Sequence, residues 1–366
     1  MRILQMISKN DRYGAQRIFL DQVSILHALG NEVTVVGCSN DGHVSEAVRA
    51  LGIPYHGISW RSIRDILFVR NLIKKKKIDV IHTTLDRADY YGMLLSRITG
   101  IPMVSTMMTF RCHHGYRIMK DVVVLSKKQK ASLEKNVIWL AKISVIRPGI
   151  DVPRFAQPHQ DKRNMWKKKL GTDNHTIIFS HVSNLLPRKG HMVSLELVAE
   201  CKRRGENPLL LVIGDPLEGE YYHSLQRKVE ELGLREQVYF TGWTFETPEL
   251  LSLTHFSLLP SEREALGVVL MEGMAAGTPV IARKGEGGAE LIEEYGTGFL
   301  YDPDEGVGPL ADRILAVKRD TVQFQTLSDR CRRIAANEFT LSRFGGKLLE
   351  LYARCGANGA SLKGGV

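Results

Sequence analysis

From Phe256 to Ala282 the chain reads FSLLPSEREALGVVLMEGMAAGTPVIA. The pattern predicts a strand over Phe256–Leu259, a helix over Val268–Ala276 that Gly277 ends, and a second strand over Pro279–Ala282. Two short apolar strands on either side of one helix are typical of a β-α-β unit, in which the strands are parallel and buried on both faces. This stretch therefore predicts an α/β fold.

The same alternation extends in both directions along the chain. Between the strands, helical periodicity predicts helices such as Gln16–Leu29, Ile63–Lys77 and His191–Arg204. Further strands are predicted at Arg2–Ile7, Glu32–Val36, Asp79–His82, Met103–Thr106, Val122–Leu125, Ile143–Ile146, Thr176–Val182, Leu209–Ile213, Val238–Thr241 and Gly298–Tyr301. The chain of 366 residues is long enough for two such sheets, each with its own core. We therefore predict two doubly wound, Rossmann-like parallel-sheet domains that face each other across a cleft.

The alternation is interrupted once, in a polar and basic run that contains Pro153 and Pro158. We predict an N-terminal domain over 1–155, a linker over 156–169 and a C-terminal domain over 170–339. The small, glycine-rich residues 357–366 predict a flexible tail.

Positive charge is concentrated in the first domain. Residues 1–155 hold 24 Lys and Arg against 12 Asp and Glu, a net charge of +12, whereas the remaining residues hold 26 against 28, a net charge of −2. A basic domain suggests a polyanionic partner such as an acidic lipid surface or a phosphorylated glycolipid. The alternative is a solvated cationic face that serves solubility. The run Lys74–Lys77 does not decide between them, since lysines at the end of a helix are also favoured by its dipole.

Several classes of protein are disfavoured by the composition. No apolar run reaches 18 residues, so no membrane-spanning helix is predicted. The five cysteines are scattered and odd in number, which fits a reducing compartment and predicts a cytoplasmic protein. No cluster has the spacing of metal ligands, so no metal is expected. The residues after the first strand lack the Gly-x-Gly-x-x-Gly pattern of nicotinamide dehydrogenases, which excludes that class.

Two glutamates frame the predicted helix Val268–Ala276. Glu264 precedes it and Glu272 lies eight residues later, roughly 10 Å further along the axis. Carboxylates accept paired hydrogen bonds from vicinal hydroxyl groups, and the backbone N–H groups at a helix start can bind a diphosphate. Taken alone, however, two such glutamates are more often a helix-start acid and a surface acid.

The surrounding motifs change that balance, because together they resemble the signature of glycosyltransferase family 4, a group of retaining enzymes with the GT-B fold. The Pro-Ser, the two glutamates eight positions apart and Gly273–Val280 match its central motif. Other matching segments are Val182–Gly190, Leu211–Asp215, Gly287–Glu290, Gly296–Phe299, Arg147–Asp151 and the loop at Gly14-Ala15. The resemblance extends over most of the chain.

The resemblance implies a role for several residues. Lys189 would hold the diphosphate of a nucleotide-sugar donor, Glu264 would bind the transferred sugar and Glu272 the ribose. These roles make Glu264 and Lys189 the catalytic candidates. The backbone at Leu266, Gly267 and Val268 would complete the phosphate cradle, and Gly14 would allow close approach to the donor. The resemblance also implies that the helix over 340–356 returns to complete the first domain; the alternative is that it caps the second domain only.

Two departures from the family pattern concern the site. Asn184 stands where the family usually has an arginine, so one phosphate-binding charge is missing, and Arg188 is a candidate replacement. Many members also carry a histidine after the strand that Met103–Thr106 occupies. Here the candidates on the acceptor side are Ala15, Arg111, His113 and His114, and the alternative is that these histidines are exposed loop residues without a ligand.

We therefore expect a retaining glycosyltransferase that needs no cofactor and moves a sugar from a nucleotide-diphosphate donor, with a UDP-sugar favoured. The expected acceptor is a glycan or glycolipid of bacterial lipopolysaccharide or polysaccharide synthesis, reached by peripheral attachment at the inner face of the membrane. Two alternatives are a GT-B epimerase or hydrolase, and a basic nucleic-acid-binding protein. No nucleic-acid partner is expected, because the chain shows no recognisable binding module.

Overall fold

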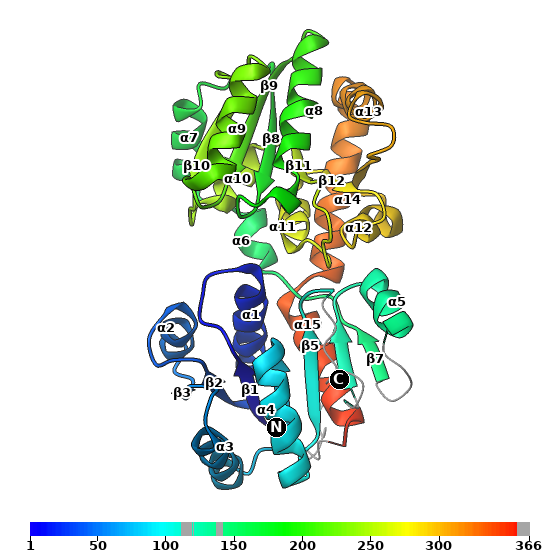
Figure 1. Ribbon diagram of the computed structural model, residues 1–366. Coiled ribbons are helices and arrows are strands. Elements are labelled where there is room, and N and C mark those ends of the chain that lie inside the picture. The colour runs from blue at the N-terminus through cyan, green and yellow to red at the C-terminus, as the bar shows by residue number, and fades with distance from the viewer. Residues whose placement is uncertain (111–118, 120, 137–141, 357–366) are drawn as a thin grey trace. The chain divides into compact units, whose positions relative to one another are not determined.

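The computed structural model describes residues 1–110, 119, 121–136 and 142–356. Contacts between residues divide the chain into two compact units. The N-terminal unit comprises Met1–Gly149 and the segment from Leu341 onward, and the C-terminal unit comprises Ile150–Thr340. Figure 1 shows the elements of each unit, which are described in turn below.

The N-terminal unit is built on a parallel sheet whose described strands follow the order β3-β2-β1-β4-β5-β6-β7. The chain winds outward from β1 in one direction and then, after β3, in the other, so this is a doubly wound sheet. The strands are β1 (Arg2–Ile7), β2 (Glu32–Gly37), β3 (Tyr55–Gly57), β4 (Val80–Thr84), β5 (Met103–Met107), β6 (Asp121–Val124) and β7 (Lys142–Val145). The helices are α1 (Gly14–Ala28), α2 (His43–Ala50), α3 (Ile63–Lys76), α4 (Asp86–Thr99), α5 (Lys127–Asn136) and α15 (Leu341–Arg354).

The last helix, α15, packs against α1 although more than 300 residues separate them (Figure 1). Its apolar face is buried in the same core as Phe19 and Leu26 of α1. Gly345 allows the close approach, because a Cβ there would meet the side chains of Ile25 and Leu29. Burial of one apolar stripe against the core is what fixes an amphipathic helix of this kind.

The C-terminal unit has a second doubly wound parallel sheet, in the order β10-β9-β8-β11-β12-β13. Its strands are β8 (Thr176–Val182), β9 (Asn207–Ile213), β10 (Val238–Gly242), β11 (Phe256–Leu259), β12 (Val280–Arg283) and β13 (Gly298–Tyr301). Its helices are α6 (Val152–Ala156), α7 (Gln160–Lys169), α8 (His191–Arg203), α9 (Gly219–Glu231), α10 (Thr247–Leu253), α11 (Val268–Ala276), α12 (Ala289–Tyr295), α13 (Gly308–Arg319) and α14 (Thr321–Glu338). Both sheets confirm the predicted fold class.

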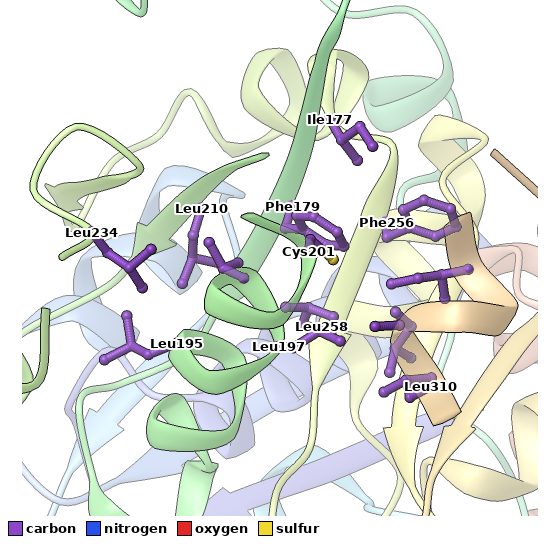
Figure 2. Close-up of a cluster of buried hydrophobic side chains, with 14 of the residues drawn as sticks. Ile177, Phe179, Leu195, Leu197, Cys201, Leu210, Leu234, Phe256, Leu258 and Leu310 are labelled. Carbon is purple, nitrogen blue, oxygen red and sulfur yellow. The ribbon is translucent and has the colours of Figure 1, made fainter. Parts of the chain in front are cut away.

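The core of the C-terminal unit lies between the sheet and helices α8 and α13. Figure 2 shows apolar side chains of β8, β9, β11, α8 and α13 meeting there. The rings of Phe179 on β8 and Phe256 on β11 stack with their centroids 5.7 Å apart. This packing holds the two central strands, β8 and β11, in register at Phe179 and Phe256.

The prediction of a linker over 156–169 is wrong. Most of it forms helix α7, and the side chain of Trp166 is buried with Ile178, Leu211 and Leu250. The indole N–H of Trp166 also donates to the carboxylate of Glu246 at 2.8 Å. The helix was not predicted because its sequence is mostly polar and basic, and its one buried apolar residue gives no periodicity. The predicted tail, 357–366, lies outside the described residues.

Within the part of the chain that the structure describes, no helix has the length and the apolar composition needed to cross a membrane.

Candidate donor-binding site

The candidate site lies where the strand order of the C-terminal sheet reverses. From β8 the chain moves outward through β9 to β10, then returns to the other side of β8 as β11. Loops at the carboxyl ends of the two strands therefore diverge at this point and leave space for a ligand, as they do in doubly wound sheets generally. The two loops are 183–190, after β8, and 260–267, after β11.

Hydrogen bonds join these two loops directly. The backbone N–H of Glu262 donates to the carbonyl of Arg188 at 2.8 Å. The hydroxyl of Ser261 donates to the carbonyl of Lys189 at 3.4 Å. Gly190 adopts a left-handed conformation, and a Cβ at this position would overlap the backbone of Pro260. Only glycine therefore allows the two loops to approach so closely.

The loops bring together two of the predicted site residues, Lys189 and Glu264. The Lys189 Nζ and a carboxylate oxygen of Glu264 lie 2.7 Å apart. Their side chains are only 17% and 16% exposed, so this pair is less screened by water than an ordinary surface ion pair. Arg188, by contrast, is exposed. Of the two adjacent cations, Lys189 is therefore the one built into the site.

The backbone of Glu264 is held by the loop after β12. A carboxylate oxygen of Glu286 accepts the N–H of Glu264 at 3.0 Å. The N–H of Gly287 donates to the carbonyl of Glu264 at 2.9 Å. A Cβ at Gly287 would overlap the carbonyl oxygens of Glu264 and Ala265, so this approach also requires glycine. Gly287 belongs to one of the matching sequence motifs, but the contacts of Gly287 and Glu286 with Glu264 were not predicted.

Helix α11 starts directly after this loop. Leu266 is buried, and Gly267 takes the position before the helix with a φ of 81°, in the left-handed region. The first backbone N–H groups of a helix, from Val268 onward, have no partner inside the helix and lie at the positive end of its dipole. Glu272 follows in the second turn of α11 with 8% of its surface exposed. It is therefore not the solvated surface acid that was the alternative interpretation.

Asn184 lies at the start of the loop after β8. It is partly buried, and its carbonyl accepts the N–H of Leu186 at 2.9 Å. This bond shapes the turn that leads to the short 3₁₀ helix Pro187–Lys189. Arg188 is exposed, and its role as a replacement for the charge that Asn184 lacks stays a prediction.

A pair of stacked histidines beneath this loop was not predicted. His181, on β8, and His191, the first residue of α8, are buried, and their ring centroids lie 4.0 Å apart with an interplanar angle of 8°. His191 Nε2 lies 3.1 Å from the hydroxyl of Ser183, and its Nδ1 lies 3.4 Å from that of Tyr221. His181 Nδ1 lies 2.8 Å from the hydroxyl of Ser194. The rings thus connect both ends of the loop 183–190.

Burial keeps both imidazoles neutral. Loss of water and, as a smaller cause, the nearby charge of Lys189 together lower the pKa of His191 to about 3. The pKa of His181 is lowered well below its ordinary value, first by burial and then by His191 and Lys189. In the sequence, the only signal is a histidine directly after Lys-Gly at a helix start, which does not reveal its distant partner.

The residues predicted in the N-terminal unit are less informative. Gly14 is the exposed first residue of α1, and a Cβ there would have no neighbour within 4 Å. Ala15 follows it in the first turn and is partly buried. Arg111, His113 and His114 lie outside the described residues. Their roles on the acceptor side therefore stay predictions.

No group of three or more His, Cys, Asp or Glu side chains suited to a metal ion occurs in the described parts of the chain. The expectation of a metal-independent reaction stays a prediction.

A lysine, two glutamates and a helix start at the switch point of a doubly wound sheet form a site suited to a phosphorylated ligand. The family described as "Glycosyltransferase Family 4" matches residues 13–154, and that described as "Glycosyl transferases group 1" matches residues 162–338. The chain belongs to glycosyltransferase family 4 and is a glycosyltransferase.

Relatives and solved structures agree with this assignment. A UDP-Gal:alpha-D-GlcNAc-diphosphoundecaprenol alpha-1,3-galactosyltransferase of Escherichia coli is 23% identical over 93% of each chain. A lipopolysaccharide core biosynthesis glycosyltransferase, LpsE of Rhizobium meliloti, is 24% identical over 93% of this chain and 96% of its own. The crystal structure of Anabaena HepE in complex with UDP matches with a TM-score of 0.84 and 22% identity, over 97% of this chain and 100% of that one. A glycosyltransferase from Rickettsia africae matches with a TM-score of 0.87 and 22% identity, over 98% and 99%. These structures confirm that the fold is GT-B.

Proposed function

We propose that this enzyme transfers a sugar from a nucleoside-diphosphate sugar, with a UDP-sugar favoured, to a glycan or glycolipid acceptor, and that it retains the configuration at the anomeric carbon. The observation that carries the proposal is the contact between Lys189 and Glu264 at the strand switch point. Complexes of HepE with UDP and with UDP-glucose support the choice of nucleotide.

Lys189 and Glu264 suit the two groups that meet at the bond to be broken. The bond joins a diphosphate, which needs a cation, to a sugar, whose hydroxyls need an acceptor. The charged atoms of Lys189 and Glu264 lie side by side, 2.7 Å apart, so one can bind the diphosphate and the other the sugar next to that bond. Lys189 then stabilises the negative charge that develops on the departing diphosphate, in a site that is largely shielded from water.

The reaction balances without a cofactor. The bond from the anomeric carbon to the diphosphate oxygen breaks, and an acceptor hydroxyl oxygen bonds to that carbon from the same face. The hydroxyl proton passes to the released diphosphate. No metal is proposed, because Lys189 and the start of α11 supply the positive charge that a diphosphate requires.

Glu272 is proposed to bind the ribose of the donor. Glu272 lies in the second turn of α11, beyond the helix start at which the diphosphate is proposed to bind. Leu266, Gly267 and Val268 provide the backbone of the phosphate cradle, and Asn184 closes it from the loop after β8. Gly14 and Ala15 are proposed to face the acceptor from the N-terminal unit, with Arg111, His113 and His114.

The acceptor is proposed to be a membrane-borne, phosphate-bearing glycolipid of lipopolysaccharide or polysaccharide synthesis. The net charge of +12 in residues 1–155 supports an anionic partner for that part of the chain. The names of the Escherichia coli and Rhizobium relatives point to the same class of acceptor. The enzyme would then act at the cytoplasmic face of the membrane, attached peripherally.

A thermal-shift titration tests the donor site. A ligand that binds only the folded state raises the melting temperature, and the rise grows with the ratio of the ligand concentration to Kd. We expect UDP and UDP-sugars to raise the melting temperature of the wild type. Lys189→Ala and Glu272→Ala should each need at least tenfold more ligand to reach the same shift. Arg188→Ala is the matched control, because it removes an adjacent but exposed cation. If both site variants respond like the wild type, the donor site is wrongly assigned.

A second measurement separates transfer from the alternative activities of a GT-B protein. Release of UDP from a bound UDP-sugar should require a lipid-linked acceptor. UDP release at the same rate without any acceptor would indicate a hydrolase, and recovery of an epimerised donor would indicate an epimerase.

A further inference from the structure

Large apolar side chains are exposed on two neighbouring helices of the N-terminal unit, α3 and α4. Fifteen large hydrophobic residues are exposed in the described parts of the chain, and six of them belong to these two helices. They are Ile63, Leu67, Phe68, Tyr90, Leu94 and Ile98, with exposed fractions between 40% and 66%. Such a concentration of exposed apolar side chains is unusual for a surface that only faces water.

The residues follow helical spacing, so they form stripes rather than scattered points. Tyr90, Leu94 and Ile98 are each four residues apart on α4, opposite the buried residues Ala88 and Leu95. On α3, Ile63 and Leu67 are also four apart, on the side away from the buried Val69. Residues at this spacing share one face of a helix.

The two helices lie against each other, which joins the stripes into one surface. The hydroxyl of Tyr91 on α4 donates to the carbonyl of Ser62, which caps α3, at 3.4 Å. The rings of Tyr91 and Trp60 are in contact, with centroids 5.0 Å apart. Phe68 lies apart from these stripes, since its ring contacts that of His56 on β3. We call the exposed face formed by Ile63, Leu67, Tyr90, Leu94 and Ile98 the α3–α4 face.

Basic side chains surround this face. Residues 61–99 contain nine Lys and Arg and four Asp and Glu, and three of the four acids are already engaged. Asp65 accepts the hydroxyl of Ser59 at 2.6 Å. Asp89 is buried and accepts from Thr83 and Ser105, and Asp79 pairs with Arg2. The exposed basic residues are Arg61, Arg64, Lys74, Lys75, Lys76, Lys77, Arg87 and Arg97.

We propose that the α3–α4 face docks on the surface of an anionic lipid bilayer. Exposed aromatic and aliphatic side chains ringed by lysine and arginine are the composition of a helix that lies in the membrane interface. Each basic residue near an anionic leaflet contributes attraction, and Tyr90 suits the headgroup level with its apolar ring and polar hydroxyl. This inference rests on the proposed lipid-linked acceptor, since it specifies the surface by which the enzyme reaches it.

Vesicle flotation of the full chain tests this inference. The vesicles contain phosphatidylcholine alone or phosphatidylcholine with phosphatidylglycerol, at low and at physiological salt. We expect the wild type to float with the anionic vesicles and its binding to weaken as salt rises. Two double variants test the apolar and the basic residues separately: Leu67→Ser with Leu94→Ser, and Lys74→Gln with Lys75→Gln. Each should weaken binding to anionic vesicles on the order of tenfold or more.

Matched control variants come from the C-terminal unit. Met165→Ser with Val322→Ser removes two exposed apolar residues, 48% and 76% exposed against 50% and 40% for Leu67 and Leu94. Lys167→Gln with Lys168→Gln removes two lysines from the end of another helix. The controls should float like the wild type. Absence of wild-type flotation with anionic vesicles, or equal losses in the variants and their controls, would overturn the inference. So would a wild-type dimer that Leu67→Ser with Leu94→Ser dissociates, since the face would then bind a second copy.

The donor titration keeps this test separate from the proposed function. The two variants of the α3–α4 face should retain the melting-temperature shift that UDP causes, because the donor site lies in the other unit. The two control variants should retain it because their residues lie outside the loops 183–190 and 260–267. Normal UDP binding without flotation contradicts the membrane surface alone, whereas flotation without a UDP effect contradicts the donor site alone.

Discussion

The two units wind their sheets in the same way but use their buried polar side chains for different purposes. In the N-terminal unit, His82 on β4 lies 2.5 Å from the hydroxyl of Tyr352 on α15 and 3.0 Å from the amide of Gln22 on α1. In the C-terminal unit, His181 and His191 connect a strand, a helix and the loop that carries Lys189. One network therefore fixes a helix in the core, and the other fixes a loop at the strand ends. Hydrogen bonds of buried histidines thus hold the core together in the N-terminal unit and position the candidate site in the C-terminal unit.

The largest effect should come from Lys189, which the C-terminal network supports. Lys189→Ala removes the cation nearest the developing charge of the leaving diphosphate. We expect kcat/KM to fall about 10²- to 10³-fold, as when one stabilising donor is removed from other active sites. Steady-state kinetics with a UDP-sugar and a lipid-linked acceptor would measure it.

Arg188→Ala is the control for this prediction, because Arg188 is adjacent but exposed. Its kcat/KM should stay within a few-fold of the wild type. A loss in Arg188→Ala as large as in Lys189→Ala would show that the wrong cation has been assigned to the diphosphate.

The comparison predicts a smaller effect for His191→Phe. Phenylalanine keeps a ring beside His181 but removes the bonds to the hydroxyls of Ser183 and Tyr221, so the loop is held less firmly. Loss of a buried hydrogen bond costs about 1–3 kcal/mol. We expect the donor KM to rise on the order of tenfold, which corresponds to the lower part of that range, while kcat changes less.

His223→Phe serves as the matched control, since His223 is exposed on α9 of the same unit. It should leave the donor KM unchanged. If His191→Phe lowers the melting temperature without any change in KM, the stacked histidines serve the core only and the proposed contrast between the units fails.

Tyr352→Phe tests the other half of the comparison. The hydroxyl of Tyr352 contacts His82 and accepts the amide of Gln5 at 3.3 Å, and all three side chains are buried. Its removal leaves polar atoms without a partner, so we expect the N-terminal unit to lose about 1–2 kcal/mol of its free energy of unfolding. Urea unfolding would measure the loss. Because this network holds α15 and not the loops after β8 and β11, the donor KM should not change, and a tenfold rise would contradict the comparison.

The sequence was sufficient to predict the parts that depend on local pattern. Alternating strands and helices predicted both sheets, and the predicted helix correctly had Glu264 before its start and Glu272 in its interior. The loop at Lys189 was also predicted, because its motif is contiguous.

The remaining features depend on residues that are far apart in the chain. Lys189 and Glu264 are 75 residues apart, and His82 and Tyr352 are 270 apart. No periodicity reports such pairs, since the sheet topology alone brings them together. Helix α7 was missed for a different reason: its single buried anchor, Trp166, is hidden in a polar run that resembles a linker.

The smallest predicted effect is a difference in the pH dependence of the two units. Burial lowers the pKa of His191 to about 3 and of His255 to about 4, and it lowers that of His181 well below its ordinary value. In the N-terminal unit, His82 is the histidine with a comparable shift among the described residues, to about 3. The C-terminal unit therefore holds three strongly shifted histidines and the N-terminal unit one.

The sign follows from the unfolded state, in which these histidines titrate near their ordinary pKa of about 6.5. Below that pH the unfolded chain binds protons that the folded unit does not, so stability is fully present above 6.5 and declines as pH falls toward the folded values. Between pH 7 and 6 each histidine should cost less than about 1 kcal/mol. Hydrogen exchange, corrected for the intrinsic rate at each pH, would resolve the units separately through peptides of β8 and β4. The β8 peptides should lose more protection than those of β4. Equal losses would contradict the prediction that burial lowers the pKa of more histidines in the C-terminal unit than in the N-terminal unit.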